Sequence, residues 1–262
     1  MLLCLPALFP PRLPAGPQPD GDRPAYRAED FVESLGLAAA PFERYLAEGP
    51  WKGAGTRYPP EFFFDLGIRY YRMGLRNDLT PEDLPRKVET WWRRTGARPL
   101  LLVNPGKSFT VKTPWLQVEE DGDFSRLVAD LRRYAPGSVA GVEGPNEVNN
   151  KFPPQELNLK YKGHTDEAAG ALYQRDLFNA LRADPATRDI PVAMFTAIFT
   201  DYSLARPCDA FDRLNMHSYQ NERVPSSSLP MNITRAANIL PAGAAMPPFQ
   251  PTECGYNVEE DK

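Results

Sequence analysis

Cysteine and histidine are scarce in this chain, with three cysteines and two histidines among 262 residues. The histidines, His164 and His217, are too few for a metal site built from clustered His or Cys ligands. The cysteines, Cys4, Cys208 and Cys254, are too few and too scattered for a disulfide framework. The sequence therefore predicts no metal, no cofactor and a core held together by ordinary packing.

A basic block and a long apolar run are also missing. Thirty Lys and Arg residues against 34 Asp and Glu residues give a net charge of −4. No positive cluster offers the electrostatic footprint of a protein that binds nucleic acid or an anionic membrane. A membrane-spanning helix needs about 20 consecutive apolar residues, and the sequence contains no such run. We expect neither nucleic acid nor membrane among its partners.

Proline is abundant instead, at 29 of 262 residues, about twice the usual share. Seven of these prolines lie within residues 1–28, so we expect 1–28 to be a disordered leader and 29–262 to form the folded domain. The apolar run at 2–9 (Leu-Leu-Cys-Leu-Pro-Ala-Leu-Phe) is short for a secretory signal and follows no basic residue. As a degenerate signal segment, it would make the protein secreted or periplasmic.

Seven short apolar runs follow the leader. The continuous run Leu100–Val103 is typical of a strand that is buried on both faces of a parallel sheet. The seven predicted strands are 31–37, 68–73, 99–103, 138–143, 190–195, 213–217 and 249–253.

Helix signals lie between these runs. The segment 80–83 (Thr-Pro-Glu-Asp) combines a capping residue, a first-turn proline and acidic residues near the positive end of the dipole, and Gly96 is a typical stop. Asp123 caps a second predicted helix, Thr165 begins a third, and 232–240 forms a shorter one. Strands that alternate with helices predict βαβ units and a parallel sheet.

Seven strands at this spacing favour an α/β fold of the (β/α)8 TIM-barrel type over a doubly wound sheet. No Gly-x-Gly-x-x-Gly signal of a dinucleotide-binding fold follows the first strand. The eighth strand-helix unit is absent, so we expect a C-terminally incomplete barrel. An open edge exposes unpaired backbone groups, and the leader is too rich in proline to fill it. Marginal stability or self-association through that edge is therefore expected.

Polar residues gather where the predicted strands end, which is where a parallel barrel carries its active site. The fourth strand runs into 143–147 (Glu-Gly-Pro-Asn-Glu), the sixth into 217–219 (His-Ser-Tyr) and the seventh into 252–256 (Thr-Glu-Cys-Gly-Tyr). Retaining glycoside hydrolysis requires two carboxylates, one as general acid and then base, the other as nucleophile.

These motifs resemble those of the clan A (β/α)8 retaining glycoside hydrolases, and are most similar to bacterial proteins near glycoside hydrolase family 39. Asn146-Glu147 and Glu253 are similar to the family's paired motif, and 65–72 (Asp-Leu-Gly-Ile-Arg-Tyr-Tyr-Arg) is similar to its second strand. The resemblance covers roughly residues 29–257. It implies a hydrolase of carbohydrate metabolism or polysaccharide degradation, acting on a β-linked oligo- or polysaccharide without a cofactor.

The resemblance also implies roles. Glu147 would be the acid/base, which has to carry a proton, and Glu253 the nucleophile, which has to be ionised. Asn146 would bind the sugar 2-hydroxyl. Arg72 would lie beside Glu253 and favour its charged form.

Five further residues are candidates for the substrate cleft. His217 and Tyr219 would orient Glu253 or contact the sugar, and Asn104 would line the cleft at the end of the third strand. Trp51 and Trp115 lie in predicted loops, where they would be either sugar-stacking platforms or packing residues.

Two neighbouring residues have a structural interpretation. Glu143 has the strand parity of Glu147 and is interpreted as an inward structural acid, and Cys254 as a small apolar filler. The alternative function is a non-catalytic or degenerate carbohydrate-binding barrel. A metal-dependent hydrolase is disfavoured because the chain has only two histidines.

Overall fold

The computed structural model describes residues 3–4, 36–37, 60–74, 83–103, 122–150, 157–198, 202, 205, 207–219 and 225–255. Most of the predicted leader and residues 31–35 of the first predicted strand lie outside this part of the chain. Within it, none of the helices combines the length and the hydropathy needed to cross a membrane.

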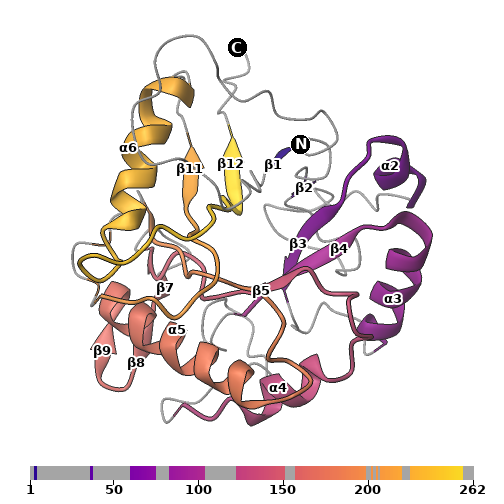
Figure 1. Ribbon diagram of the computed structural model, residues 1–262, viewed down its shortest axis with the longest axis horizontal. Coiled ribbons are helices and arrows are strands. Elements are labelled where there is room, and N and C mark those ends of the chain that lie inside the picture. The colour runs from indigo at the N-terminus through magenta and orange to yellow at the C-terminus, as the bar shows by residue number, and fades with distance from the viewer. Residues whose placement is uncertain are drawn as a thin grey trace, which may run out of the picture.

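A parallel sheet forms the centre of the fold, so the predicted α/β class is confirmed. Its strands pair in parallel and in chain order (Figure 1). They are β2 (Gly36–Leu37), β3 (Tyr70–Gly74), β4 (Arg98–Leu102), β5 (Gly141–Glu143) and β10 (Val192–Ala193).

Parallel pairing continues beyond β10. Single bridges join Ala193 to Arg213 and Leu214 to Phe249. The strands β11 (His217–Tyr219) and β12 (Glu253–Gly255) then pair with each other. Each shares one residue with its predicted strand, His217 of 213–217 and Glu253 of 249–253, and extends two residues further. The earlier residues of the two predicted strands pair through the single bridges.

The N-terminal residues provide a strand that the sequence did not predict. β1 (Leu3–Cys4) pairs antiparallel with β2 and also lies against β12 (Figure 1). The expectation that the leader cannot occupy the sheet edge is therefore wrong for these two residues. The prolines of the leader begin only at Pro6, so Leu3 and Cys4 keep the backbone N–H groups that a strand needs.

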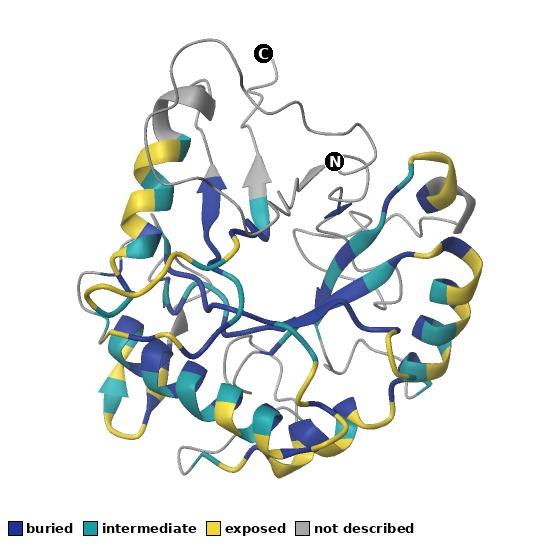
Figure 2. Ribbon diagram, viewed as in Figure 1, coloured by how far each residue is buried: buried dark blue, intermediate teal, exposed yellow. Residues whose placement is uncertain are grey.

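Helices pack around the outside of the strands (Figure 1). They are α2 (Pro60–Asp65), α3 (Leu84–Thr95), α4 (Ser125–Leu131), α5 (Asp166–Ala183) and α6 (Pro225–Ala237). Figure 2 shows buried strands and helices whose outer faces are exposed. The core is therefore the layer between strands and helices, as in the edge-to-face contacts of Phe63 on α2 with Tyr71 on β3 and Trp91 on α3.

The end of the helix predicted after 80–83 is confirmed, but its start is wrong, because α3 begins at Leu84 and Asp83 is its N-cap. Gly96 ends α3 with a φ of 76°, and its N–H donates to the carbonyl of Trp92 at 2.8 Å. The carboxylate of Asp123 accepts the Ser125 N–H at 2.8 Å at the start of α4. The helix expected at 232–240 instead spans Pro225–Ala237 and contains Pro230, which lacks the N–H for a helical hydrogen bond.

Two small antiparallel hairpins interrupt the connection from β5 to α5, and the sequence analysis did not predict them. β6 (Asn149–Asn150) pairs with β7 (Leu157–Asn158), and β8 (Lys160–Tyr161) pairs with β9 (His164–Thr165). The first hairpin begins two residues after Glu147, and it therefore bears on the site.

Candidate active site

The fold brings the polar ends of several strands together. Arg72 belongs to β3, Glu143 ends β5, and Glu147 lies in the loop that follows. His217 and Glu253 begin β11 and β12, where the parallel register places them opposite each other. These residues lie far apart in the sequence and meet because the ends of parallel strands share one edge of the sheet.

The loop after β5 is pressed against the segment after β10. A Cβ atom on Gly144 would lie 2.0 Å from Oε1 of Gln174, the oxygen that accepts the Phe195 N–H at 2.9 Å. Only glycine fits at this approach. Further along the loop, the backbone N–H of Glu147 donates to the Thr196 hydroxyl at 2.9 Å. The loop is therefore anchored on both sides of Asn146.

Glu147 has a backbone φ of 44°, a left-handed conformation that costs a non-glycine residue about 1–3 kcal/mol. Two contacts with Asn150 hold it there. The Asn150 N–H donates to the Glu147 carbonyl at 2.8 Å, and its Nδ2 donates to Oε2 of Glu147 at 2.9 Å. The strained backbone sets the direction of the carboxyl group, and Asn150 holds one of its oxygens.

The Arg72 guanidinium joins two carboxylates. Its Nε donates to Oε2 of Glu143 at 2.6 Å and its Nη2 to Oε1 at 2.8 Å, which makes a bidentate pair. Its Nη1 donates to Glu253, and Nη2 also donates to Oδ1 of Asn146 at 2.7 Å. An adjacent cation favours the ionised form of a carboxylate. Arg72 thus provides the setting in which Glu253 carries a negative charge.

Glu143 is the buried acid that strand parity predicts, with a side chain that is 0% exposed. Besides Arg72, its Oε1 accepts the Thr252 hydroxyl at 3.0 Å and Nδ2 of Asn215 at 3.3 Å. A buried carboxylate is tolerated only when it is paired and hydrogen-bonded, and this one meets both conditions.

Burial also keeps a neighbouring phenol neutral. Desolvation raises the pKa of Tyr202, and the negative charge of Glu143 raises it further. Its hydroxyl donates to the carbonyl of Phe195 at 3.3 Å. Tyr202 therefore supports the segment after β10 and adds no charge to the site.

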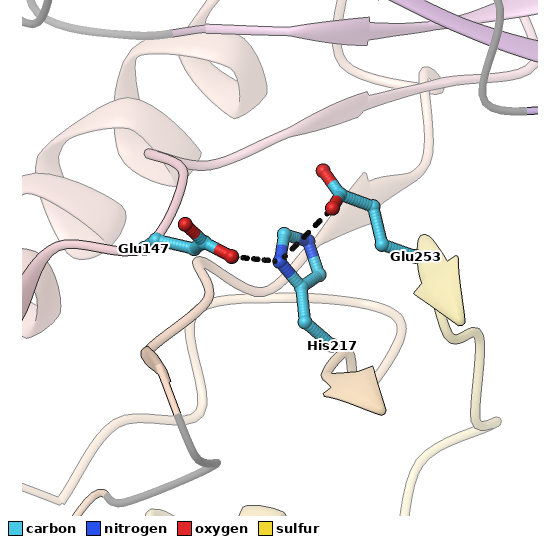
Figure 3. Close-up of side chains that lie close together, drawn as sticks. All are labelled: Glu147, His217 and Glu253. Atoms are coloured by element: carbon cyan, nitrogen blue, oxygen red, sulfur yellow. Dashed lines mark hydrogen bonds and ion pairs between the residues drawn. The ribbon is translucent and has the colours of Figure 1, made fainter. Parts of the chain in front are cut away.

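His217 lies between the two predicted catalytic carboxylates (Figure 3). Its Nδ1 is 3.0 Å from Oε1 of Glu147 and 3.6 Å from Oε2 of Glu253, and its Nε2 is 3.2 Å from the Thr252 hydroxyl. The ring is almost fully buried, with a side chain that is 2% exposed. One oxygen of Glu147 and one of Glu253 lie within 4.8 Å of each other and of a His217 ring nitrogen.

Glu147, His217 and Glu253 are also the described residues whose donor atoms approach closely enough to be considered for a metal ion. The surrounding charges do not suit that use. Arg72 already contacts Glu253, and its positive charge would repel a dication at the same carboxylate. We therefore interpret the three side chains as an acid–base group.

The other predicted site residues are placed only in part. Asn146 is partly exposed beside Arg72. Tyr219 ends β11, but its side chain lies outside the described residues, as do Asn104, Trp51 and Trp115. Their roles stay predictions.

Besides Asn150, which holds the Glu147 carboxyl group, sequence reasoning missed Asn215 and Thr252. Asn215 precedes His217 by two residues and therefore has its strand parity, a signal that could have revealed it. Its Nδ2 donates to the Met194 carbonyl at 3.0 Å, and its Oδ1 accepts the Thr252 N–H at 3.0 Å. For Thr252, the only sequence signal was its position next to Glu253.

A cavity of about 510 Å³ lies elsewhere, between α4 and α5. Its charged lining residues are paired, Lys162 with Asp176 at 2.8 Å and Arg132 with Asp184. It contains neither Glu147 nor Glu253, so it is separate from the carboxylate site.

No family model matches the sequence, and no curated protein matches it. Among solved structures, the chain is similar to N2152 from Neocallimastix frontalis, with a TM-score of 0.45 and 12% identity over 72% of this chain and 47% of that one. It is also similar to the selenomethionine form of BT1044 carrying a glutamate-to-glutamine substitution, with a TM-score of 0.39 and 10% identity over 76% of this chain and 61% of that one. The chain thus spans about half and about three fifths of these neighbours. Similarity this distant leaves the function to be argued from the site.

Proposed function

We propose that this protein is a retaining glycoside hydrolase that cleaves a β-linked oligo- or polysaccharide, with Glu147 as the acid/base and Glu253 as the nucleophile. The approach of their carboxylate oxygens to within 4.8 Å carries the proposal. Retaining enzymes have carboxyl groups about 5–5.5 Å apart, whereas inverting enzymes need about 6.5–9.5 Å to admit a water molecule. The motif resemblance to clan A enzymes near family 39 supports the same assignment.

In the first step, the ionised Glu253 attacks the anomeric carbon while Glu147 gives its proton to the glycosidic oxygen. The bond to the leaving sugar breaks, and a glycosyl ester forms on Glu253. In the second step, the Glu147 carboxylate takes a proton from water as the water oxygen attacks the anomeric carbon. The ester bond breaks, and both glutamates return to their starting states.

Arg72 and Asn146 support the charge changes of this reaction. Arg72 contacts Glu253 and holds Oδ1 of Asn146 at 2.7 Å. That contact orients the amide, and we assign its Nδ2 to the sugar 2-hydroxyl. A hydrogen bond there strengthens as the oxocarbenium-like transition state forms.

The proposal includes a barrel of the (β/α)8 type in which β1 occupies the position of the eighth strand. Two observations support it. The parallel strands follow chain order from β2 to β12, and β1 pairs with β2 and lies against β12. With β1 in place, the edge that would drive self-association is covered.

The test is the anomer of the first product. Aryl β-glycosides of several sugars and β-linked oligosaccharides are incubated with the protein, and proton NMR spectra are taken before mutarotation. We expect the β-anomer first, and Glu89→Gln, a change on the outer face of α3, to leave the rate unaltered. An α-anomer as first product would refute the retaining mechanism. Saturable oligosaccharide binding without hydrolysis would support the non-catalytic carbohydrate-binding barrel instead.

A further inference from the structure

A chain of hydrogen bonds runs from the buried Glu143 to the acid/base candidate, and its donors and acceptors can be assigned. The Asn215 amide is oriented by two backbone groups, since its Oδ1 accepts the Thr252 N–H and its Nδ2 donates to the Met194 carbonyl. Nδ2 is therefore also the group that faces Oε1 of Glu143. Together with the bidentate pair from Arg72, this makes Glu143 an ionised carboxylate that only accepts hydrogen bonds.

The Thr252 hydroxyl has one hydrogen and two neighbours, Oε1 of Glu143 at 3.0 Å and Nε2 of His217 at 3.2 Å. Because Glu143 cannot donate, the hydroxyl hydrogen points to Glu143. The lone pairs of the hydroxyl then face His217, so Nε2 of His217 carries a hydrogen and donates it. The opposite orientation would leave two unprotonated oxygens facing each other at 3.0 Å.

We propose that Glu143 and Thr252 are positioning residues that keep a hydrogen on Nε2 of His217, so that Nδ1 is the ring nitrogen left to contact Glu147. The contact between Nδ1 and Oε1 of Glu147 is 3.0 Å long. This inference rests on the proposed function for its catalytic meaning and on the geometry alone for the tautomer.

This arrangement serves both steps of the proposed reaction. In the first step Glu147 gives its proton to the leaving oxygen, and in the second its carboxylate takes a proton from water. The 3.0 Å contact with Nδ1 of His217 holds Oε1 of Glu147 in place through both transfers.

Nitrogen-15 NMR of histidine-labelled protein tests the tautomer directly. With only two histidines in the chain, the His164→Gln variant assigns the His217 signals. At neutral pH we expect Nε2 of His217 to carry a hydrogen. A ring protonated only at Nδ1 would overturn the proposal.

Thr252→Val tests the positioning role, because valine keeps the shape of threonine but cannot accept the Nε2 hydrogen. We expect the His217 population to shift toward Nδ1–H, and Thr252→Ser to restore the original spectrum. Thr187→Val, which removes a buried hydroxyl at the end of α5, is the matched control and should leave His217 unaltered. An unchanged spectrum in Thr252→Val would mean that Thr252 does not set the tautomer.

Two further measurements complete the test. If Thr252→Val does not fold, Glu147→Gln serves instead. Its amide can donate to Nδ1 and should keep Nε2 protonated, so loss of that tautomer would overturn the proposal.

In kinetics, Thr252→Val should slow the hydrolysis of substrates with poor leaving groups by up to about 10²-fold and change the hydrolysis of activated aryl glycosides little. An equal loss on both would contradict the positioning role. Absence of any hydrolysis, with the NMR result intact, would refute only the proposed function.

Discussion

Arg72→Met should destabilise the protein strongly, because Arg72 is the cation that compensates a fully buried carboxylate. Methionine keeps much of the apolar length of the side chain and removes the charge together with both hydrogen bonds to Glu143. The Glu143 side chain is 0% exposed and that of Arg72 is 13% exposed, so solvent cannot replace the lost partner. Glu253, 18% exposed, loses its cation as well.

The expected cost follows from that burial. Removing one partner of a buried ion pair costs about 3–5 kcal/mol, mostly from the uncompensated charge that stays behind. In a chain of this size, 1 kcal/mol shifts the melting temperature by about 2–4 °C, so we expect a decrease of about 6–20 °C.

Thermal and urea denaturation measure this effect, with Arg93→Met as the matched control. Arg93 pairs with Glu89 at 2.7 Å on α3, but the two side chains are 68% and 35% exposed, and such pairs contribute about 0.5 kcal/mol or less. The double variant Arg72→Met, Glu143→Leu should regain part of the lost stability. If Arg72→Met lost no more stability than Arg93→Met, the account of Glu143 as a buried charge would be refuted.

Three further predictions concern the site, a surface pair and the sheet edge. Glu253→Gln should abolish hydrolysis of every substrate. Glu147→Ala should retain the first step on activated aryl glycosides and regain turnover when azide is added. Identical behaviour of the two variants would contradict the assigned roles. The hydrogen bond from Arg132 lowers the pKa of Asp184 below its ordinary value of 3.8, so its carboxylate stabilises the fold above that pH and less as the pH falls further. In urea denaturation, the free energy of unfolding should be higher for wild type than for Asp184→Asn at neutral pH, and this difference should decrease below pH 3.8. A difference that does not change with pH would contradict the prediction. Deleting residues 1–4 should expose the edge of β2 and increase self-association in light scattering, and an unaltered monomer would show that β1 does not protect the edge.

Local sequence patterns predicted the strands and most of the helices because both depend on neighbouring residues. The apolar run at 100–103 predicts β4 because its own side chains are buried. Gly96 predicts the end of α3 because glycine readily adopts a left-handed backbone conformation. The failures were also local. The helix predicted at 232–240 begins at Pro225, and the prolines of the leader led us to exclude Leu3 and Cys4, which precede them.

The sequence by itself determined the α/β class and the parallel pairing of the strands, since both follow from periodicity, and its motifs predicted Glu147 and Glu253 as the two carboxylates of the site. Only the tertiary structure decided that β1 covers the sheet edge, that Glu147 takes a left-handed backbone conformation, and that Thr252 links Glu143 to His217. These features depend on contacts between distant residues, such as Thr252 and Glu143, which are 109 positions apart. Whether a hydrogen bond forms depends on a few tenths of an ångström. The spacing of residues along the sequence does not specify distances that precisely.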